Sequence, residues 1–372
     1  QGSGRAGGDG VMAKLGEVCL LKAGKFVSAN DISPEYNKGL YPCFGGNGIR
    51  GYVADYTHDG EFPLIGRQGA LCGNVNLASG KFHATEHAVV VQPKIEMNVH
   101  WLYYAINAMN LGQYATGAAQ PGLAVSKLET LSIEIPNISE QNKIAQTLYK
   151  VEQLVNFRKQ QLAKLDELVK AQFVEMFGDI NVNNKKWMTY PLGELCTIVR
   201  GGSPRPIERY LGGTIPWIKI GDATTGENIY LNSTKEYIIQ EGVKKSRMIK
   251  AGSLIFANCG VSLGFARIIT FDGCIHDGWL AMEDIDEKLD KIFLLYSLNQ
   301  MTEYFRKTAP AGTQPNLNTN IMKMHRQIVP PMEMQKAFIS FVKCADRQKQ
   351  IVQQSLDKLE LMKKALMQEY FG

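Results

Sequence analysis

Two long stretches of this chain carry apolar residues at alternating spacings of four and three positions. In the first stretch, which we expect to begin with Ser139 as the N-cap, Arg158 and Gln172 interrupt the apolar stripe; in the second, Lys349 and Lys363 interrupt it. This spacing is typical of helices that pair as a coiled coil. A helix of about 39 residues would be about 58 Å long. We therefore expect the two helices to project and to pair in antiparallel orientation, with separate packing of each helix on its own domain as the alternative. The apolar positions expected to pair them are Ile144, Leu148, Val151, Val155, Leu162, Leu165, Val342, Val352, Leu356, Leu359 and Leu366.

The two helical stretches belong to an internal repeat. Pro136 and Pro330 precede them at an offset of 194 residues, and a Phe-Gly pair ends each one. A second repeated segment, found at Leu15–Cys19 and again at Leu192–Cys196, has an offset of 177 residues. Repeats fix architecture, so the chain is expected to use one module twice. The unequal offsets place about 17 extra residues in the variable body of the second copy and none in the shared tail.

The segments before the two helices have a different pattern. Short apolar runs such as Phe62–Ile65 and Ser253–Phe256 alternate with turn signals, which predicts a mostly β body with one or two helices. Trp101–Met109 and Lys291–Thr308 are the candidate helices, and the polar Asp179–Lys186 reads as a linker. The predicted fold class is α+β: two mostly β domains, each followed by a long helix, with the helices forming an antiparallel coiled coil of pseudo-two-fold symmetry.

The predicted parts of the chain follow from these patterns. They are a cloning remnant at residues 1–11, a first body at 12–137, a first long helix at 138–178, a linker at 179–189, a second body at 190–331 and a second long helix at 332–372. Met12 is the expected natural start.

Composition adds exclusions. The chain has 372 residues, which suits two to three domains, and a net charge of +5, which permits a polyanionic ligand without demanding one. Its 7 cysteines form no Cys-x-x-Cys motif, which argues against zinc and against a disulfide framework. Cys19 and Cys196 are expected to be small core residues. The sequence contains no run of 18 apolar residues, and a reducing cytoplasm is the expected location.

Enzyme motifs are scarce. The sequence has no phosphate-binding Gly-x-x-x-x-Gly-Lys loop, no His-Glu-x-x-His and no Gly-x-Ser-x-Gly. Phe44–Gly48 fits the glycine-rich turn that can hold S-adenosylmethionine, but no helical pattern follows it, so we interpret it as a β-turn. The carboxylates are scattered and suggest no acid–base pair. We predict that this chain is not an enzyme and binds neither a metal nor a cofactor of its own.

Side chains suited to reading DNA gather in or beside glycine-rich loops of both bodies. Arg and Lys neutralise phosphates or read guanine, and Asn and Gln can make two hydrogen bonds to adenine. Each of them alone could be an ordinary solvated residue, so the duplicated setting carries the hypothesis. The candidate DNA-binding residues are Lys22, Lys25, Asn47, Arg50, Arg67, Gln68, Lys81, Arg200, Ser203, Arg205, Arg209, Lys219, Lys244, Lys245, Arg247 and Asn258. A Gln-Pro-x-Leu loop recurs at Gln120–Leu123 and Gln314–Leu317; we favour a structural turn at the helix base over a binding loop.

These features together resemble the specificity subunit of a type I restriction–modification system. The resemblance rests on the paired Leu-Gly-Glu openings, on Ile215–Asp222, on Leu64–Gly69 with its partner Ile255–Gly260, on the Gln-Pro-x-Leu loops and on the helices that run from proline to Phe-Gly. It spans essentially all of residues 12–372. Each motif is loose, but their order, repeated twice at this length, is specific.

The resemblance implies a function. Each body would be a target recognition domain that reads half of a split DNA sequence, and the paired helices would act as a ruler between the halves. Two modification subunits would methylate adenine with S-adenosylmethionine, and restriction subunits would add an ATP- and Mg-dependent nuclease. Gly201–Arg205 has no evident partner near Lys22–Lys25, which predicts an asymmetric target. The alternatives are an adenine methyltransferase with its own reader and a coiled-coil scaffold that binds no DNA.

Overall fold

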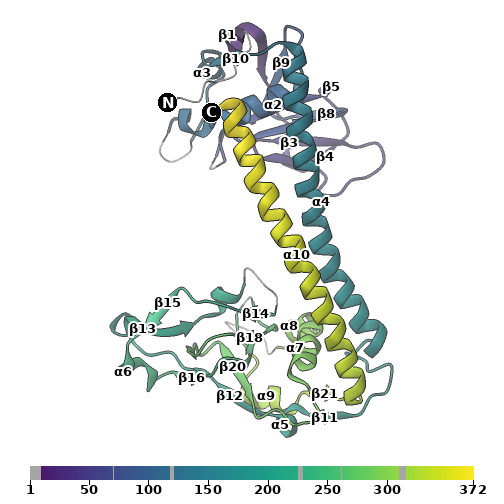
Figure 1. Ribbon diagram of the computed structural model, residues 1–372, viewed down its shortest axis with the longest axis vertical. Coiled ribbons are helices and arrows are strands. Elements are labelled where there is room, and N and C mark those ends of the chain that lie inside the picture. Colours follow the sequence, from purple (N-terminus) through teal and green to yellow (C-terminus); the bar gives the residue numbers. More distant parts are fainter. Residues whose placement is uncertain (1–9, 70, 118–120, 225–228, 261, 310–315) are drawn as a thin grey trace, which may run out of the picture. The chain divides into compact units, whose positions relative to one another are not determined.

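The computed structural model describes residues 10–69, 71–117, 121–224, 229–260, 262–309 and 316–372. The chain divides into two compact units (Figure 1). Unit 1 comprises Gln1–Gln160 and Gln353–Gly372, and unit 2 comprises Gln161–Val352. Each unit therefore contains residues from both copies of the repeat. The predicted remnant falls largely on residues 1–9, outside the described residues, and the first strand begins at Val11.

Unit 1 is built on two four-stranded sheets. Their strand orders are β2-β9-β6-β7 and β4-β3-β8-β5, and a separate ribbon joins β1 to β10. Strand β9 lies inside its sheet and carries the buried run Ala88–Val91, which explains its unbroken apolar sequence. The strands of unit 1 are β1 (Val11–Lys14), β2 (Cys19–Ala23), β3 (Tyr41–Gly45), β4 (Gly48–Val53), β5 (His58–Asp59), β6 (Phe62–Gly66), β7 (Val75–Ala78), β8 (Lys81–Ala84), β9 (Ala88–Pro93) and β10 (Ser132–Ile135). Its short helices are α1 (Leu15–Val18), α2 (Val99–Ala108) and α3 (Val125–Glu129).

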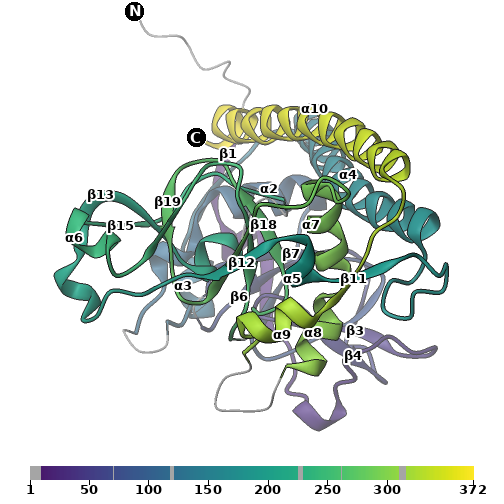
Figure 2. The same cartoon turned by 90° about the horizontal axis from the view of Figure 1, so that it is seen from below.

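Unit 2 repeats this plan with additions. Its larger sheet has the order β12-β20-β17-β18-β14, its second sheet has the order β15-β13-β19-β16, and a ribbon joins β11 to β21. Helix α7 packs against β18 (Figure 2). The strands of unit 2 are β11 (Thr189–Pro191), β12 (Thr197–Arg200), β13 (Leu211–Ile218), β14 (Tyr230–Leu231), β15 (Glu236–Ile238), β16 (Arg247–Ile249), β17 (Leu254–Ala257), β18 (Ala266–Ile269), β19 (Gly273–Ile275), β20 (Trp279–Glu283) and β21 (Arg326–Ile328). Its short helices are α5 (Leu192–Leu195), α6 (Gln240–Val243), α7 (Lys291–Gln300), α8 (Thr302–Thr308) and α9 (Thr319–Met324).

The two bodies share a topology that their sequences barely show. The order β2-β9-β6-β7 corresponds to β12-β20-β17-β18, and each second sheet contains one parallel pair, β3 with β8 and β13 with β19. The duplication therefore extends through the variable bodies. The predicted α+β fold, with two mostly β bodies and two long helices, is confirmed.

The long helices are α4 (Ile138–Phe177) and α10 (Met332–Phe371), each of 40 residues. Their pairing is antiparallel in both units, because the start of one helix meets the end of the other. In unit 1, Lys363 Nζ lies 2.6 Å from Glu152 Oε1 and Lys159 Nζ lies 2.9 Å from Glu360 Oε1. In unit 2, Lys349 pairs with Asp166.

The polar residues that interrupt the helical stripe thus have cross-helix partners. Lys349 and Lys363 form the ion pairs just described, and Arg158 Nε donates to Ser355 Oγ at 3.1 Å. The apolar positions predicted to pair the two helices differ in burial. Those below a tenth exposed are Ile144, Leu148, Val151, Val155, Val342, Val352 and Leu356, whereas Leu162, Leu165, Leu359 and Leu366 are only partly buried.

Each body is completed by the far end of the other copy's helix. In unit 1, Phe371 of α10 packs on Trp101 of α2, with ring centroids 6.4 Å apart. In unit 2, Phe177 of α4 lies edge-on to Phe293 of α7 at 4.8 Å and is fully buried. Gly178, in the left-handed region at φ 79°, then ends α4 as a glycine C-cap does.

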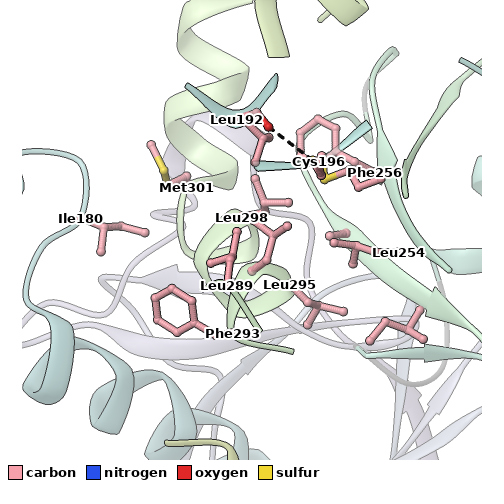
Figure 3. Packing of buried hydrophobic residues seen from close by; sticks show 14 of the residues in the cluster. Ile180, Leu192, Cys196, Leu254, Phe256, Leu289, Phe293, Leu295, Leu298 and Met301 are labelled. Carbon is pink, nitrogen blue, oxygen red and sulfur yellow. Dashed lines mark hydrogen bonds between the residues drawn. The ribbon is translucent and has the colours of Figure 1, made fainter. Parts of the chain in front are cut away.

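The core of unit 2 gathers around α7. Figure 3 shows Leu295 and Leu298 of this helix on the side of Leu254 and Phe256 of β17, whereas Phe293 lies on the other side, where it contacts Phe173 and Phe177 of α4. The two cysteines predicted to be core residues are buried, Cys19 in unit 1 and Cys196 in unit 2, and burial raises the pKa of each thiol to about 12. That prediction is confirmed.

Candidate nucleic-acid interface

Four loop segments of unit 1 are joined by backbone hydrogen bonds where β2 ends and β9 begins. Gly24 N donates to Ala88 O at 3.0 Å, and Lys25 N donates to Ala84 O at 2.8 Å. Arg67 N donates to His87 O at 3.0 Å, and Leu123 N donates to Arg67 O at 2.9 Å. We call residues 24–25, 66–69, 84–88 and 121–123 the unit 1 loop cluster.

Unit 2 builds the same arrangement from different residues. Gly201 N donates to Trp279 O at 2.9 Å, and Gly202 N donates to Ile275 O at 3.0 Å. Asn258 N donates to Gly278 O at 2.9 Å, and Leu317 N donates to Asn258 O at 2.8 Å. Residues 201–202, 257–260, 275–279 and 316–317 form the unit 2 loop cluster. The matching bonds align Arg67 with Asn258 and Glu86 with Asp277.

A glycine is required at the same point of each cluster. A Cβ on Gly24 would lie 2.0 Å from Ala84 O, and one on Gly201 would lie 2.2 Å from His276 O. Backbone from two segments crosses there with no room for a side chain. The sequence suggested that Gly201–Arg205 has no partner near Lys22–Lys25; this was wrong, because Gly24 occupies the position of Gly201.

The candidate residues of unit 1 fall into two groups. Lys25, Arg67 and Gln68 belong to the loop cluster itself. Asn47 lies beside it in the β3–β4 turn, where its Oδ1 accepts from Asn74 Nδ2 at 2.7 Å, and Arg50 crosses the face of Gly45. Lys22 is exposed on β2 two residues before Gly24.

Lys81 lies apart from this cluster. It begins β8, whose other end at Ala84 reaches the cluster. Its ammonium lies 4.7 Å from the centre of the Tyr56 ring, and interaction with Tyr56 raises the pKa of Lys81. The structure therefore places Lys81 in a local contact with an aromatic side chain, away from the converging loops.

In unit 2, several candidates converge on the turn between β19 and β20. Ser203 Oγ donates to Asp277 Oδ1 at 2.7 Å, and Arg200 Nε donates to Asp277 O at 2.9 Å. Arg247 Nε donates to Arg200 O at 2.9 Å, and Arg205 lies close enough to lower the pKa of Asp277. Ser203, Arg200 and Arg205 thus lie around Asp277, and Arg247 holds Arg200 in place.

Other candidates of unit 2 lie around this centre. Lys245 Nζ donates to Tyr210 Oη at 2.6 Å, and Ser246 Oγ ties this segment to Gly202 O at 2.8 Å. Lys219 is paired with Glu236 and lies 5.7 Å from the Trp217 ring centre. Exposed positions without a bond to the cluster in the described residues are Arg209 and Lys244.

Asn258 differs from the rest, because it is fully buried. Its Nδ2 donates to Asn316 Oδ1 at 3.2 Å, and its backbone binds Gly278 and Leu317. The side chain therefore holds the loops together and has no exposed atom to offer a base. The structure counts against the predicted direct contact at this position.

Sequence reasoning missed His276 and Asp277. The carboxylates looked scattered, and the signal that could have found this pair is the Ile-His-Asp-Gly turn between two apolar runs. Burial lowers the pKa of His276. Burial alone would raise the pKa of Asp277, but the Ser203 hydrogen bond, His276 and two arginines outweigh it and lower the pKa. Asp277 is therefore ionised at neutral pH.

The recurring Gln-Pro-x-Leu loops lie partly outside the described residues, which exclude Gln120, Gln314 and Pro315. Their described ends bind the loop clusters: Pro121 O accepts from Gly69 N at 3.0 Å. Leu123 and Leu317 are buried in the cores of units 1 and 2. The described residues of both loops are therefore bonded to the loop clusters, whereas the sequence placed them at the helix base.

Other chemistry is poorly supported. Gly45–Gly48 closes the hairpin of β3 and β4, so the predicted β-turn is confirmed. A surface depression of about 700 Å³ in unit 2 is lined by acidic residues such as Glu283 and Asp290, at the end of β20 remote from the loop cluster. Within the described ranges, no three His, Cys, Asp or Glu side chains are grouped to hold a metal ion. No helix in those ranges is long and apolar enough to cross a membrane.

The fold and the duplicated loop clusters agree with comparisons to known proteins. Residues 9–167 and 184–361 match the family described as type I restriction modification DNA specificity domain. The chain belongs to this family. The match confirms the predicted resemblance and, with it, the prediction of a specificity subunit in place of a methyltransferase.

Individual relatives carry the same description. The EcoprrI specificity subunit of Escherichia coli is 51% identical over 149 residues, which is 40% of this chain and 37% of that protein. A putative type I specificity subunit of Haemophilus influenzae is 26% identical over 82% of this chain and 80% of its own length. The S subunit structure from M. genitalium shares the fold, with a TM-score of 0.61 at 17% identity over 99% of this chain and 97% of that one. A chain from a structural study of type I complex assembly has a TM-score of 0.62 at 14% identity, covering 100% and 99%.

Proposed function

We propose that this chain is the DNA-reading subunit of a type I restriction–modification complex and that it recognises a bipartite, asymmetric target. The observation that carries the proposal is the loop cluster built twice with one backbone pattern and two different sets of side chains. Loops on a fixed scaffold are where recognition varies. Membership in the specificity family supplies the ligand class.

The side chains at matched positions support an asymmetric target. Arg67 and the exposed Gln68 of unit 1 stand where unit 2 has Asn258, whose side chain is buried, and Cys259. Unit 2 adds Arg200 and Arg205 beside its cluster. Different donors and acceptors select different base pairs in the major groove. Two unlike clusters should therefore read two unlike half-sites.

The helices are proposed to set the spacing between the half-sites. Each long helix takes part in the core of both units, through Ile144 and Phe177 for α4 and through Phe338 and Phe371 for α10. The helices also offer exposed apolar residues, including Leu154, Phe157 and Leu361, to further subunits. We propose double-stranded DNA, two modification subunits and restriction subunits as partners. S-adenosylmethionine, ATP and Mg would be used by those partners.

The test is to map methylated adenines in cells that carry this chain and its modification subunit. The expected motif has two different half-sites separated by a constant number of base pairs. Cells with the modification subunit alone are the control and should lack the motif. Methylation without a split motif would refute the proposal. Adding seven residues to both helices in register should lengthen the spacer by about 10 Å, or about three base pairs; an unchanged spacer would refute the ruler.

A further inference from the structure

Asp277 is a carboxylate set among cations on the unit 2 loop cluster. Its side chain is 38% exposed and its Oδ1 accepts from Ser203 Oγ at 2.7 Å. His276 Nε2 lies 3.0 Å from the same oxygen. The Asp277 backbone is held as well, because its carbonyl accepts from Arg200. The carboxylate is thus fixed in position by three residues.

The histidine beside it has a defined proton. Gly278 N donates to His276 Nδ1 at 2.9 Å, so Nδ1 is an acceptor. Burial disfavours the charged imidazolium, which leaves one proton on Nε2, facing Asp277 Oδ1. Oδ1 therefore receives two donors. Within the part of the chain that the structure describes, no hydrogen bond or ion pair uses Oδ2.

An available carboxylate oxygen has few partners on DNA. Phosphates repel it, whereas the exocyclic amino groups of bases can donate to it. In the major groove, adenine places its N7 lone pair next to the amino group, which disfavours an anion there. The major-groove edge of cytosine itself carries the N4 amino group and no acceptor, and Asp or Glu can accept a hydrogen bond from it.

We propose that Asp277 reads the N4 amino group of a cytosine in the half-site recognised by unit 2, with Ser203 and His276 as positioning residues. This inference rests on the function proposed above. It applies to unit 2 alone. The matched residue of unit 1, Glu86, lies 3.2 Å from His87 through one oxygen, and its other oxygen is buried.

The experiment uses the full chain assembled with its modification subunit and the target found by methylation mapping. Binding is measured to duplexes in which each base pair of both half-sites is changed in turn. Asp277→Asn should lower the preference for cytosine about tenfold at one position of the unit 2 half-site. Discrimination in the other half-site should not change. Ser203→Ala should reduce the preference at the same position by a smaller factor.

Asp272→Asn is the matched control. Asp272 precedes β19 at the end opposite Asp277, and its carboxylate is paired with Lys250. Removing its charge should leave every base preference as it was. Equal weakening of all sequences by Asp277→Asn, or unchanged preferences, would overturn the inference. If Asp277→Asn disrupts unit 2, Ser203→Ala decides, because the lost preference must fall at one cytosine. A wild-type complex with no sequence preference would instead refute the proposed function.

Discussion

The two loop clusters have the same backbone and unlike side chains. In both, a glycine at the end of a strand passes beneath a turn, and a second segment donates its N–H to that turn. Backbone bonds depend little on side-chain identity, so the scaffold can be kept while the surface changes. Unit 2 uses this freedom to surround Asp277 with donors, whereas unit 1 has Arg67 and Glu86 at the matched places.

The clusters also differ in how their polar atoms are satisfied. In unit 1, Thr85 Oγ1, Glu86 Oε2 and Arg67 Nε are buried and have no hydrogen-bond partner among the described residues. In unit 2, the carboxylate at the matched position has two donors. A buried polar atom without a partner costs about 1–3 kcal/mol. Asn258 Oδ1 of the unit 2 cluster is also buried without a partner among the described residues, so both clusters carry this cost.

The largest difference should come from the aromatic residues that end the helices. Phe177→Ala removes a fully buried ring that contacts Phe293 and Phe338 in unit 2, so we expect the free energy of unfolding of that unit to fall by about 3–5 kcal/mol. Phe371→Ala, at a partly exposed ring, should lower the stability of unit 1 by about 1–2 kcal/mol.

Tryptophan fluorescence during urea unfolding separates the two effects. Trp101 belongs to unit 1, and the other tryptophans, Trp187, Trp217 and Trp279, belong to unit 2. Phe157→Ala, at an exposed position of α4, is the control and should change little. A loss of stability in unit 1 for Phe177→Ala, or in unit 2 for Phe371→Ala, would contradict the assignment of one helix end to each core.

Substituting Gly24 and Gly201 should test whether the two loop clusters have the same backbone arrangement. Gly24→Ala and Gly201→Ala each force a Cβ against a carbonyl oxygen, so each should cost about 1–3 kcal/mol in its own unit. Each should also weaken recognition of one half-site only. Gly221→Ala is the matched control, because a Cβ there meets nothing within 4 Å. A Gly201→Ala protein as stable as the Gly221→Ala protein would show that the crossing is not tight.

The helices were predictable because their period is set by burial. The apolar stripe identified α4 and α10, and polar interruptions such as Lys363 turned out to have partners on the facing helix. Leu162 and Leu359 are partly exposed, so the apolar pattern predicted more burial between the helices than the structure has at these two positions. The sequence did not predict that the end of each helix packs in the core of the other copy. Both helices end in Phe-Gly, and the pattern does not indicate which body each end contacts.

The loop clusters could not be predicted in this way. Gly24 and Gly201 are equivalent because they make matching backbone hydrogen bonds, and such bonds do not require particular side chains nearby. Asn258 was predicted to contact DNA because it lies in a glycine-containing loop after an apolar run, but its burial depends on loops distant in sequence. Asp277 was missed for the same reason, since Ser203 reaches it only in the folded chain.

The smallest predicted effect is a difference between the two units in how far acid lowers their free energy of unfolding. His325 of unit 2 stands where unit 1 has Leu131, because each backbone carbonyl accepts from the leucine that opens α5 or α1. Burial lowers the pKa of His325 to about 4. Between that value and about 6.5, the unfolded chain binds the proton and the folded chain does not, so stability rises with pH.

Lowering the pH from 7 to 5 should therefore cost unit 2 about 1–2 kcal/mol, and His325→Leu should abolish this part of the loss. Urea unfolding at the two pH values measures it, with His87→Leu in unit 1 as the control; an equal pH slope in wild type and His325→Leu would show that His325 is not buried as a neutral ring.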